Sequence, residues 1–418
     1  MVSGSSTSVT PQNATKAADP SLSLYHLLEP SVLADPYPLY RRLRTEDPVH
    51  WDPFLHKWVL TRYADVVFAL QRFSAKCAPT PEQLDMMGMG VLSPAAQVMV
   101  KQMLFMDPPA HTRIRGLAAK AFTPRRVEVL REHIEDIVDG MLDEVAAKGS
   151  MEVIADLAAP LTATVTGELL GVPRADRDQL KAWSADFAEL LGNFQLNPDR
   201  VPRVLRSIEA LLSYFHDAVR RDRENPHDGL IHALVTAEID GDRLTDEEIV
   251  TNTIVTMVGG QETTTNLIAT GLLTLFRHPD QLDRLRDDLS LIPSAVEELL
   301  RYEAPSQQTT RIAPEDVELG GKLIHKGESC LVVMGAANRD PERFPDPDRL
   351  DLTRPDNRHV AFGWAGHFCF GAPLGRVEGQ IAFRKIFQRF PDLQLGPGPI
   401  TWRNNLGLRG LNALSVVL

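Results

Sequence analysis

The sequence predicts a mainly α-helical protein with small β-sheet regions, folded as a single domain. Long amphipathic stretches, in which apolar residues recur at helical spacing, fill the middle of the chain. Short alternating segments typical of strands are concentrated near residues 49–60 and 319–334. No internal repeat, low-complexity linker or change of composition marks a second folding unit in the 418 residues.

The N-terminal 20 residues are rich in Ser, Thr, Ala and Pro, which is typical of a disordered leader. They lack the basic start and apolar run of a signal peptide. We therefore expect the folded domain to cover residues 21–418. No window is expected to be long and apolar enough to span a bilayer.

Within the domain, a short helix is predicted over Pro36–Arg44 and a hairpin over residues 49–60. The following segment, Ala78–Met106, is expected to be irregular. Its Met86 and Met89 suit either an adaptable apolar lining or the filling of a core, and the sequence does not separate the two.

The middle of the chain is predicted to be mostly helix. The expected helices are Ala110–Ala121, Arg125–Ala147, Ala159–Leu170, Arg174–Gly192, Pro202–Asn225 and Asp246–Phe276. Short strands with Gly-containing turns are expected over Leu319–Met334, followed by an irregular stretch to about Arg358.

Composition restricts the kinds of partner that the protein is expected to bind and the compartment in which it is expected to fold. The net charge of -12 argues against a general affinity for nucleic acid or for an anionic membrane. Cys77, Cys330 and Cys369 are odd in number and far apart, so neither a disulfide framework nor a zinc site is supported. A reducing, cytoplasmic location is expected.

One cysteine stands in a distinctive setting. Cys369 lies among glycines and aromatic residues in the segment Phe362–Gly371, directly before a predicted helix. The partial positive charge of a helix N-terminus favours a thiolate, and a thiolate can bind iron. Taken alone, a buried structural thiol in a glycine-rich turn would be the commoner account.

The whole string resembles the haem-binding loop of the cytochrome P450 family, F-G-x-G-x-H-x-C-x-G, followed by a helix with L-x-R-x-E. The matching positions are Phe362, Gly363, His367, Cys369, Gly371, Leu374, Arg376 and Glu378. One position departs, because Ala365 stands where the pattern has its second glycine and Gly366 follows one place later. Alanine reaches only part of the backbone range of glycine.

The resemblance implies the cytochrome P450 fold, with haem b (iron protoporphyrin IX) buried between the long central helix and the helix after the cysteine loop. It implies Cys369 as the axial ligand of the iron, Gly371 beside the cofactor and His367 near a haem propionate.

Glu298 and Arg301 lie three residues apart, which is the spacing of a side-chain pair on one helical face. The motif is short, and an isolated pair of this kind is usually a surface feature. The resemblance implies a structural role instead, with an arginine of the loop before the cysteine as third partner. Arg354 is the candidate, whereas Pro341–Phe344 comes too early in that loop.

The predicted long helix contains a weak interior segment, Val258–Thr265, with two glycines and three threonines. In the family this helix crosses the haem. The resemblance implies that Glu262 and Thr263 form the catalytic acid and alcohol pair that delivers protons during cleavage of dioxygen. The alternative is that the threonines only bend the helix.

His111 and Arg115 fall four residues apart after a Pro-rich loop, so both can face one carboxylate-binding site. The resemblance implies that they bind haem propionates together with Arg311.

The function implied is a monooxygenase that uses O2 to hydroxylate or epoxidise a medium-sized hydrophobic substrate, such as a polyketide, macrolide, terpenoid or steroid. Residues expected near the substrate are Met86, Met89, Phe187, Val258, Gly259, Gln308 and Leu406. Electrons are expected from an external ferredoxin and its NAD(P)H-dependent reductase, because the chain has no flavin-binding motif and too few cysteines for an iron–sulfur cluster. Basic residues expected at that docking face are Arg113, Lys120, Arg125, Arg126 and Arg376.

Two other functions of the same fold stay open. A peroxygenase would use hydrogen peroxide, but would be expected to replace Glu262 and Thr263. A haem-thiolate sensor or binding protein would have no turnover, and so would have no need of Glu262 and Thr263. A helical interaction module without cofactor would lack the colour of haem.

Overall fold

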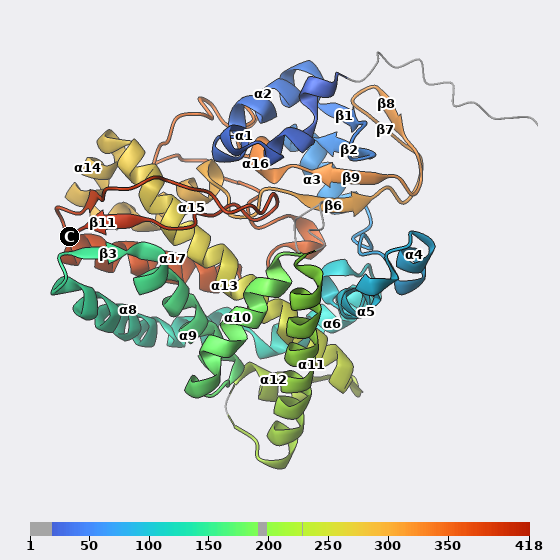
Figure 1. Ribbon diagram of the computed structural model, residues 1–418, viewed down its shortest axis with the longest axis horizontal. Helices are drawn as coiled ribbons and strands as arrows, with labels where there is room; N and C mark the ends of the chain where they lie inside the picture. Colours follow the sequence, from blue (N-terminus) through green and yellow to red (C-terminus); the bar gives the residue numbers. More distant parts are fainter. Residues whose placement is uncertain (1–18, 191–198, 228) are drawn as a thin grey trace, which may run out of the picture.

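The computed structural model describes residues 19–190, 199–227 and 229–418. A large helical part and a smaller part that contains the main sheet lie against each other (Figure 1). Most of the predicted leader lies outside the described residues. Its last two residues are structured, because the Asp19 side chain caps a short turn that begins at Pro20.

The mainly α fold with small sheets is confirmed. The helices are α1 (Pro30–Ala34), α2 (Tyr37–Glu46), α3 (Tyr63–Arg72), α4 (Pro81–Met86), α5 (Ser93–Met99), α6 (Ala110–Ala121), α7 (Pro124–Val129), α8 (Arg131–Ala146), α9 (Ala159–Leu170), α10 (Arg177–Ala188), α11 (Val201–Glu224), α12 (Leu230–Thr236), α13 (Asp246–Arg277), α14 (Pro279–Asp287), α15 (Ile292–Tyr302), α16 (Met334–Ala337) and α17 (Ala372–Arg389).

Helix α13 organises the helical part. It begins with a capping box, in which the Thr245 side chain and Glu248 satisfy each other's backbone N–H groups, and three acidic residues of the first turn complement the helix dipole. Most of its later side chains are buried, and the helix packs against α9, α10, α11 and α17. The helix is therefore held by packing on several sides, which lets it carry weak helix formers at its centre.

The strands are β1 (Val49–Asp52), β2 (Lys57–Leu60), β3 (Ser150–Glu152), β4 (Glu238–Ile239), β5 (Asp242–Arg243), β6 (Thr309–Ile312), β7 (Val317–Leu319), β8 (Lys322–Ile324), β9 (Ser329–Val332), β10 (Gln394–Leu395) and β11 (Ser415–Val417). The main sheet has the order β1-β2-β9-β6, in which only β2 and β9 run parallel. It carries Arg311, on β6, to the edge of the helical part.

Two predictions of local structure are wrong. The segment Ala78–Met106 is not irregular, because Thr80 and Gln83 form a capping box that starts α4, and α5 follows. The helix predicted over Arg125–Ala147 is broken at Leu130 into α7 and α8. The helices α4, α5 and α7 have six, seven and six residues, too few to show a helical period of apolar residues in the sequence.

The expectation about apolar windows is also wrong. Val153–Leu170, a π-helical turn that continues into α9, has a mean hydropathy of 1.3 over 18 residues, enough by composition to cross a bilayer. However, 56% of that window is buried inside the protein, and α9 packs closely on α13. Its apolar surface is thus used in the core.

Candidate functional site

A cavity of about 320 Å³ lies between the centre of α13, the segment before α17 and the edge of the main sheet. Its walls are largely apolar. The predicted residues that line it are His111, Arg115, Gly259, Thr263, Arg311, His367, Cys369 and Gly371. Residues separated by more than 250 positions in the sequence therefore meet at one cavity.

The Cys369 thiol faces this cavity and forms no disulfide. The backbone N–H of Cys369 donates to the Phe362 carbonyl at 2.7 Å, which closes the loop. Burial raises the pKa of the Cys369 thiol, while the backbone N–H groups of Gly371 and Ala372 and the Arg115 guanidinium act in the opposite sense. Donors aimed at the sulfur would stabilise a thiolate once it binds a metal.

The donor set fits an iron that brings its own ring of ligands. Among the described residues there is no group of three or more His, Cys, Asp or Glu side chains that could hold a bare metal ion. A single cysteine sulfur at the wall of an apolar cavity suits instead a metal carried in a flat macrocycle, as in haem.

The backbone of the cysteine loop shows how Ala365 takes the place of the glycine in the family pattern. Its φ of 52° and that of Gly363, 73°, lie in the left-handed region. Glycine adopts this conformation without strain, whereas alanine is strained there by about 1 kcal/mol or more. Gly366, one place later, is not in the left-handed region. The loop therefore keeps the backbone turn of the pattern even though Ala365 has replaced the glycine.

Four basic side chains meet at one end of the cavity. The imidazole rings of His111 and His367 stack with centroids 4.0 Å apart, and Arg115 and Arg311 lie beside them. Burial, followed by the charges of His111, Arg311 and Arg115, lowers the pKa of His367 to about 4. The buried His111 Nε2 and Arg311 Nε have no hydrogen-bond partner among the described residues. Such a group fits two carboxylates, as on the edge of a haem.

At the centre of α13 the predicted proton-delivery pair separates. Thr263 lines the cavity and its hydroxyl donates to the Gly259 carbonyl at 2.8 Å, one turn earlier. Glu262 lies outside the lining and forms an ion pair with Arg403, on the loop before β11. The sequence did not indicate Arg403, because 141 positions separate it from its partner.

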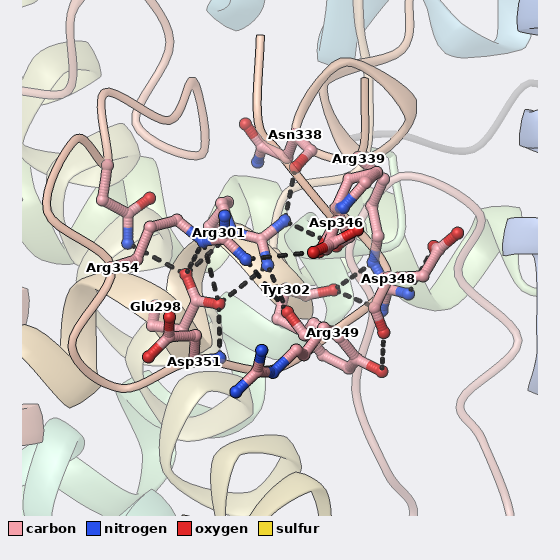
Figure 2. A network of polar contacts seen from close by, with 12 residues as sticks. Glu298, Arg301, Tyr302, Asn338, Arg339, Asp346, Asp348, Arg349, Asp351 and Arg354 are labelled. Carbon is pink, nitrogen blue, oxygen red and sulfur yellow. Dashed lines mark hydrogen bonds and ion pairs between the residues drawn. The ribbon is translucent and has the colours of Figure 1, made fainter. Parts of the chain in front are cut away.

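Figure 2 shows the polar network around Glu298 and Arg301, which are both fully buried. Two Arg301 nitrogens donate to the two Glu298 oxygens at 2.8 Å each. Arg354 donates to the same oxygens at 3.1 and 3.3 Å, and so occupies the predicted third position. The remaining Arg301 donors reach backbone carbonyls of the loop between β9 and α17, including that of Asn338.

The segment Pro341–Phe344 does not bind the Glu298 carboxylate, as expected from its early position in the loop. Arg343 pairs with the exposed Asp356, and the Phe344 ring packs against the Arg301 guanidinium, 5.4 Å from its centroid. The network thus ties α15 to the loop that leads to Cys369.

Of the residues expected near the substrate, only Gly259 lines the cavity. Met86 and Met89 point to solvent, with 81% and 39% of their surface exposed. Phe187, Val258 and Gln308 are buried elsewhere, and Leu406 faces a separate small hollow. Lining residues that were not expected there include Leu70, Leu104, Thr166, Leu300 and Met334. Thr264 and Glu378 also line the cavity, and both had a signal in the sequence, the weak segment Val258–Thr265 and the L-x-R-x-E match.

Most of the basic residues expected at a docking face are bound to neighbouring groups of the protein. Arg113 forms ion pairs with Asp242 and Glu248, and Arg376 binds Glu297 through two hydrogen bonds. Lys120 is exposed and reaches a backbone carbonyl. The side chains of Arg125 and Arg126 lie outside the described part.

Comparison with known proteins gives consistent matches. The family model "Cytochrome P450" matches residues 85–394. The chain is 42% identical to the cytochrome P450 monooxygenase PikC of Streptomyces venezuelae over 97% of its own length and 96% of that protein. It is 39% identical to the 6-deoxyerythronolide B hydroxylase of Saccharopolyspora erythraea, over 92% and 96% of the two chains. The solved structure of P450BioI with an acyl carrier protein has a TM-score of 0.87 at 36% identity and covers 93% of this chain and 99% of that one.

Proposed function

Because the chain belongs to the cytochrome P450 family and is a haem-thiolate monooxygenase, we propose that it inserts one oxygen atom of O2 into a medium-sized hydrophobic substrate. The reaction would be hydroxylation or epoxidation. The observation that carries this proposal is that Cys369, Thr263 and the basic group around His367 all face one cavity.

The cofactor proposed is haem b. Cys369 would bind the iron, while His111, Arg115, Arg311 and His367 would bind the propionates, since they meet at one end of the cavity. His111 and Arg311 each have a nitrogen without a partner among the described residues. Bound haem supplies the binding and reductive cleavage of dioxygen, and the protein supplies position, protons and exclusion of water. Gly371 would allow close approach of the ring, because it carries no side chain.

Proton delivery is proposed to run through α13. Thr263 can present its hydroxyl to the cavity, and Glu262 is next to it in the chain. The Glu262 side chain is 13% exposed and its partner Arg403 is 31% exposed, so the pair connects the interior with solvent. Proton delivery requires an acid near solvent followed by a hydroxyl at the cavity wall, and Glu262 and Thr263 supply the two groups in this order.

The substrate proposed is an apolar molecule with few polar groups, of the polyketide, macrolide, terpenoid or steroid class. The apolar lining supports this, since Leu70, Val255, Leu300 and Met334 present hydrocarbon to the cavity. The similarity to a hydroxylase of 6-deoxyerythronolide B supports it further.

The electron donors proposed are an external ferredoxin and an NAD(P)H-dependent reductase, in the cytoplasm. The three cysteines are free and far apart, so they can neither form an iron–sulfur cluster nor indicate an oxidising compartment.

The deciding experiment is turnover under isotopically labelled dioxygen with NAD(P)H, ferredoxin and reductase. We expect one labelled oxygen atom in the product. Label from water, or no product, would contradict a monooxygenase reaction on that substrate. Greater activity with peroxide alone would favour a peroxygenase, which the presence of Glu262 and Thr263 argues against.

A further inference from the structure

Glu297 of α15 binds both ends of the segment that carries Cys369. Its carboxylate contacts His359, which lies ten residues before the cysteine, and Arg376, which lies seven residues after it. The neighbouring Glu298 belongs to the separate network of Figure 2. The two adjacent acids therefore hold different parts of the chain, and Glu297 is the one that reaches both sides of the cysteine.

The hydrogen bonds hold the Glu297 carboxylate in one orientation. The Nε and Nη2 atoms of Arg376 donate to its two oxygens at 2.7 and 2.8 Å. The Nδ1 atom of His359 accepts the Ala361 backbone N–H at 3.2 Å, so Nε2 carries the proton and donates it to Glu297 at 3.3 Å. The ion pair is partly buried, with 28% of the Glu297 and 31% of the Arg376 side chain exposed, so solvent screens its charges only in part.

The Arg376 guanidinium lies close to the cysteine loop. It covers the Phe362 ring at 4.6 Å from the ring centroid, and the Phe362 carbonyl accepts the Cys369 backbone N–H at 2.7 Å. Phe362 also lines the cavity. Burial raises the pKa of the Cys369 thiol, and the positive charge of Arg376 is among the influences that act in the opposite sense. The charge of Arg376 therefore acts at the sulfur.

Glu297 brings a negative charge to the same place. Although burial raises its pKa, the hydrogen bonds from Arg376 and His359 hold the pKa of this carboxyl down, at about 2, so it is ionised at neutral pH. Opposite charges in contact cancel much of each other's field at a distance. The electric field at Cys369 is therefore set by Arg376 and Glu297 together.

We propose that Glu297 is a positioning residue that sets the reduction potential of an iron bound to Cys369, by holding Arg376 over Phe362 and cancelling part of its positive charge. Arg376 favours the reduced state, because an added electron places negative charge near the guanidinium, and Glu297 opposes it. The electron comes from the external donor, and the three side chains of the network gain or lose no proton. This inference rests on haem bound at Cys369, as in the proposed function.

Potentiometric titration of the holoenzyme with a chemical reductant, without ferredoxin, tests the proposal. Glu297→Gln keeps the shape of the side chain and removes its charge, so we expect a higher reduction potential than in the wild type. Arg376→Gln should lower the potential. The double variant removes both charges and should have a potential close to that of the wild type.

The matched control is Asp139→Asn. Asp139, on α8, pairs with Lys385 of α17 at 2.7 Å. Lys385 lies nine residues beyond Arg376, which is about 14 Å further along the helix axis from the cysteine. This variant therefore removes one acid from an ion pair of α17 that is remote from the sulfur, and it should leave the potential unchanged.

If Glu297 only stabilised the loop, both single variants would shift the potential in the same direction, and the double variant would shift it at least as far. That result, or equal potentials in Glu297→Gln and Asp139→Asn, would overturn the proposal. Where Glu297→Gln does not bind haem, an unchanged or raised potential in Arg376→Gln would overturn it. A wild type without a thiolate signature under carbon monoxide would contradict the proposed function as well, so the two failures are distinguishable.

Discussion

Arg354 donates to both carboxylate oxygens of Glu298 from a position 56 residues further along the chain. Glu298 is fully buried and also accepts hydrogen bonds from Arg301. Removal of Arg354 leaves Glu298 paired with Arg301 alone, and the loss of hydrogen bonds to a charged group costs about 1.5–3 kcal/mol. We therefore expect Arg354→Ala to lower the free energy of unfolding by about this amount and to reduce haem content, as measured by chemical denaturation and pyridine haemochrome assay.

The control for this prediction is Arg343→Ala in the same loop. Arg343 pairs with Asp356, whose side chain is 58% exposed, and surface pairs contribute less than about 1 kcal/mol. Equal losses in the two variants would show that the loop, and not the contact with Glu298, is being destabilised.

Cys369→Ala should abolish the thiolate signature of the reduced protein under carbon monoxide, because its sulfur is the candidate iron ligand that faces the cavity. Absorption spectroscopy makes the measurement. Cys330→Ala is the control, since that thiol is buried on β9 away from the cavity. A thiolate spectrum that survives in Cys369→Ala would assign the iron to another ligand.

Ala365→Gly should stabilise the protein. Glycine removes the strain of φ 52°, worth about 1–2 kcal/mol, and part of this gain is offset by the greater freedom of glycine in the unfolded chain. We expect a net gain of about 0.5–1 kcal/mol by thermal unfolding. The matched control is Gly363→Ala, which should destabilise the protein, because it places a methyl group at φ 73° in the same left-handed region. A destabilised Ala365→Gly would mean that the alanine methyl group makes a contact worth more than the strain.

The lowered pKa of Glu297 predicts that the protein loses stability in acid. Although burial raises its pKa, hydrogen bonds from Arg376 and His359 hold the pKa of this carboxyl down, at about 2, below the ordinary value of 4.5. The ionised form is therefore favoured by the fold. Its contribution, up to about 3 kcal/mol, is complete above pH 4.5 and is lost as pH falls toward 2.

Denaturation at a series of pH values checks this expectation. Glu297→Gln should be less stable than the wild type at neutral pH, and the difference should shrink steadily below pH 4.5. A difference that is constant across this range would assign the effect to packing rather than to ionisation.

The sequence predicted the fold and the residues at the cavity because both rest on local patterns. Helix α13 has caps and periodicity, and the cysteine loop has a dense motif. The ion pair of Glu262 with Arg403 and the approach of Thr166 to Gly260 were not predictable in this way. They depend on how helices and loops pack, and neither residue type nor spacing indicates them.

The prediction of the substrate-facing positions was mostly wrong for the same reason. Met86 and Met89 have the side chains of an apolar lining, yet both are exposed to solvent, at the end of α4 and just after it. Leu70 and Met334 instead approach the cavity from distant elements. Apolar residues are common in both settings, so composition could not distinguish them.

The ion pair between Arg403 and Glu262 has a practical consequence for engineering. It joins the loop from Trp402 to Gly410 to the middle of α13, so the two cannot be altered separately. Libraries that randomise this loop would therefore also disturb Glu262, the acid proposed to deliver protons to the cavity. Screens that score only consumption of NAD(P)H would then select wasteful variants, and selection should score product per electron pair instead.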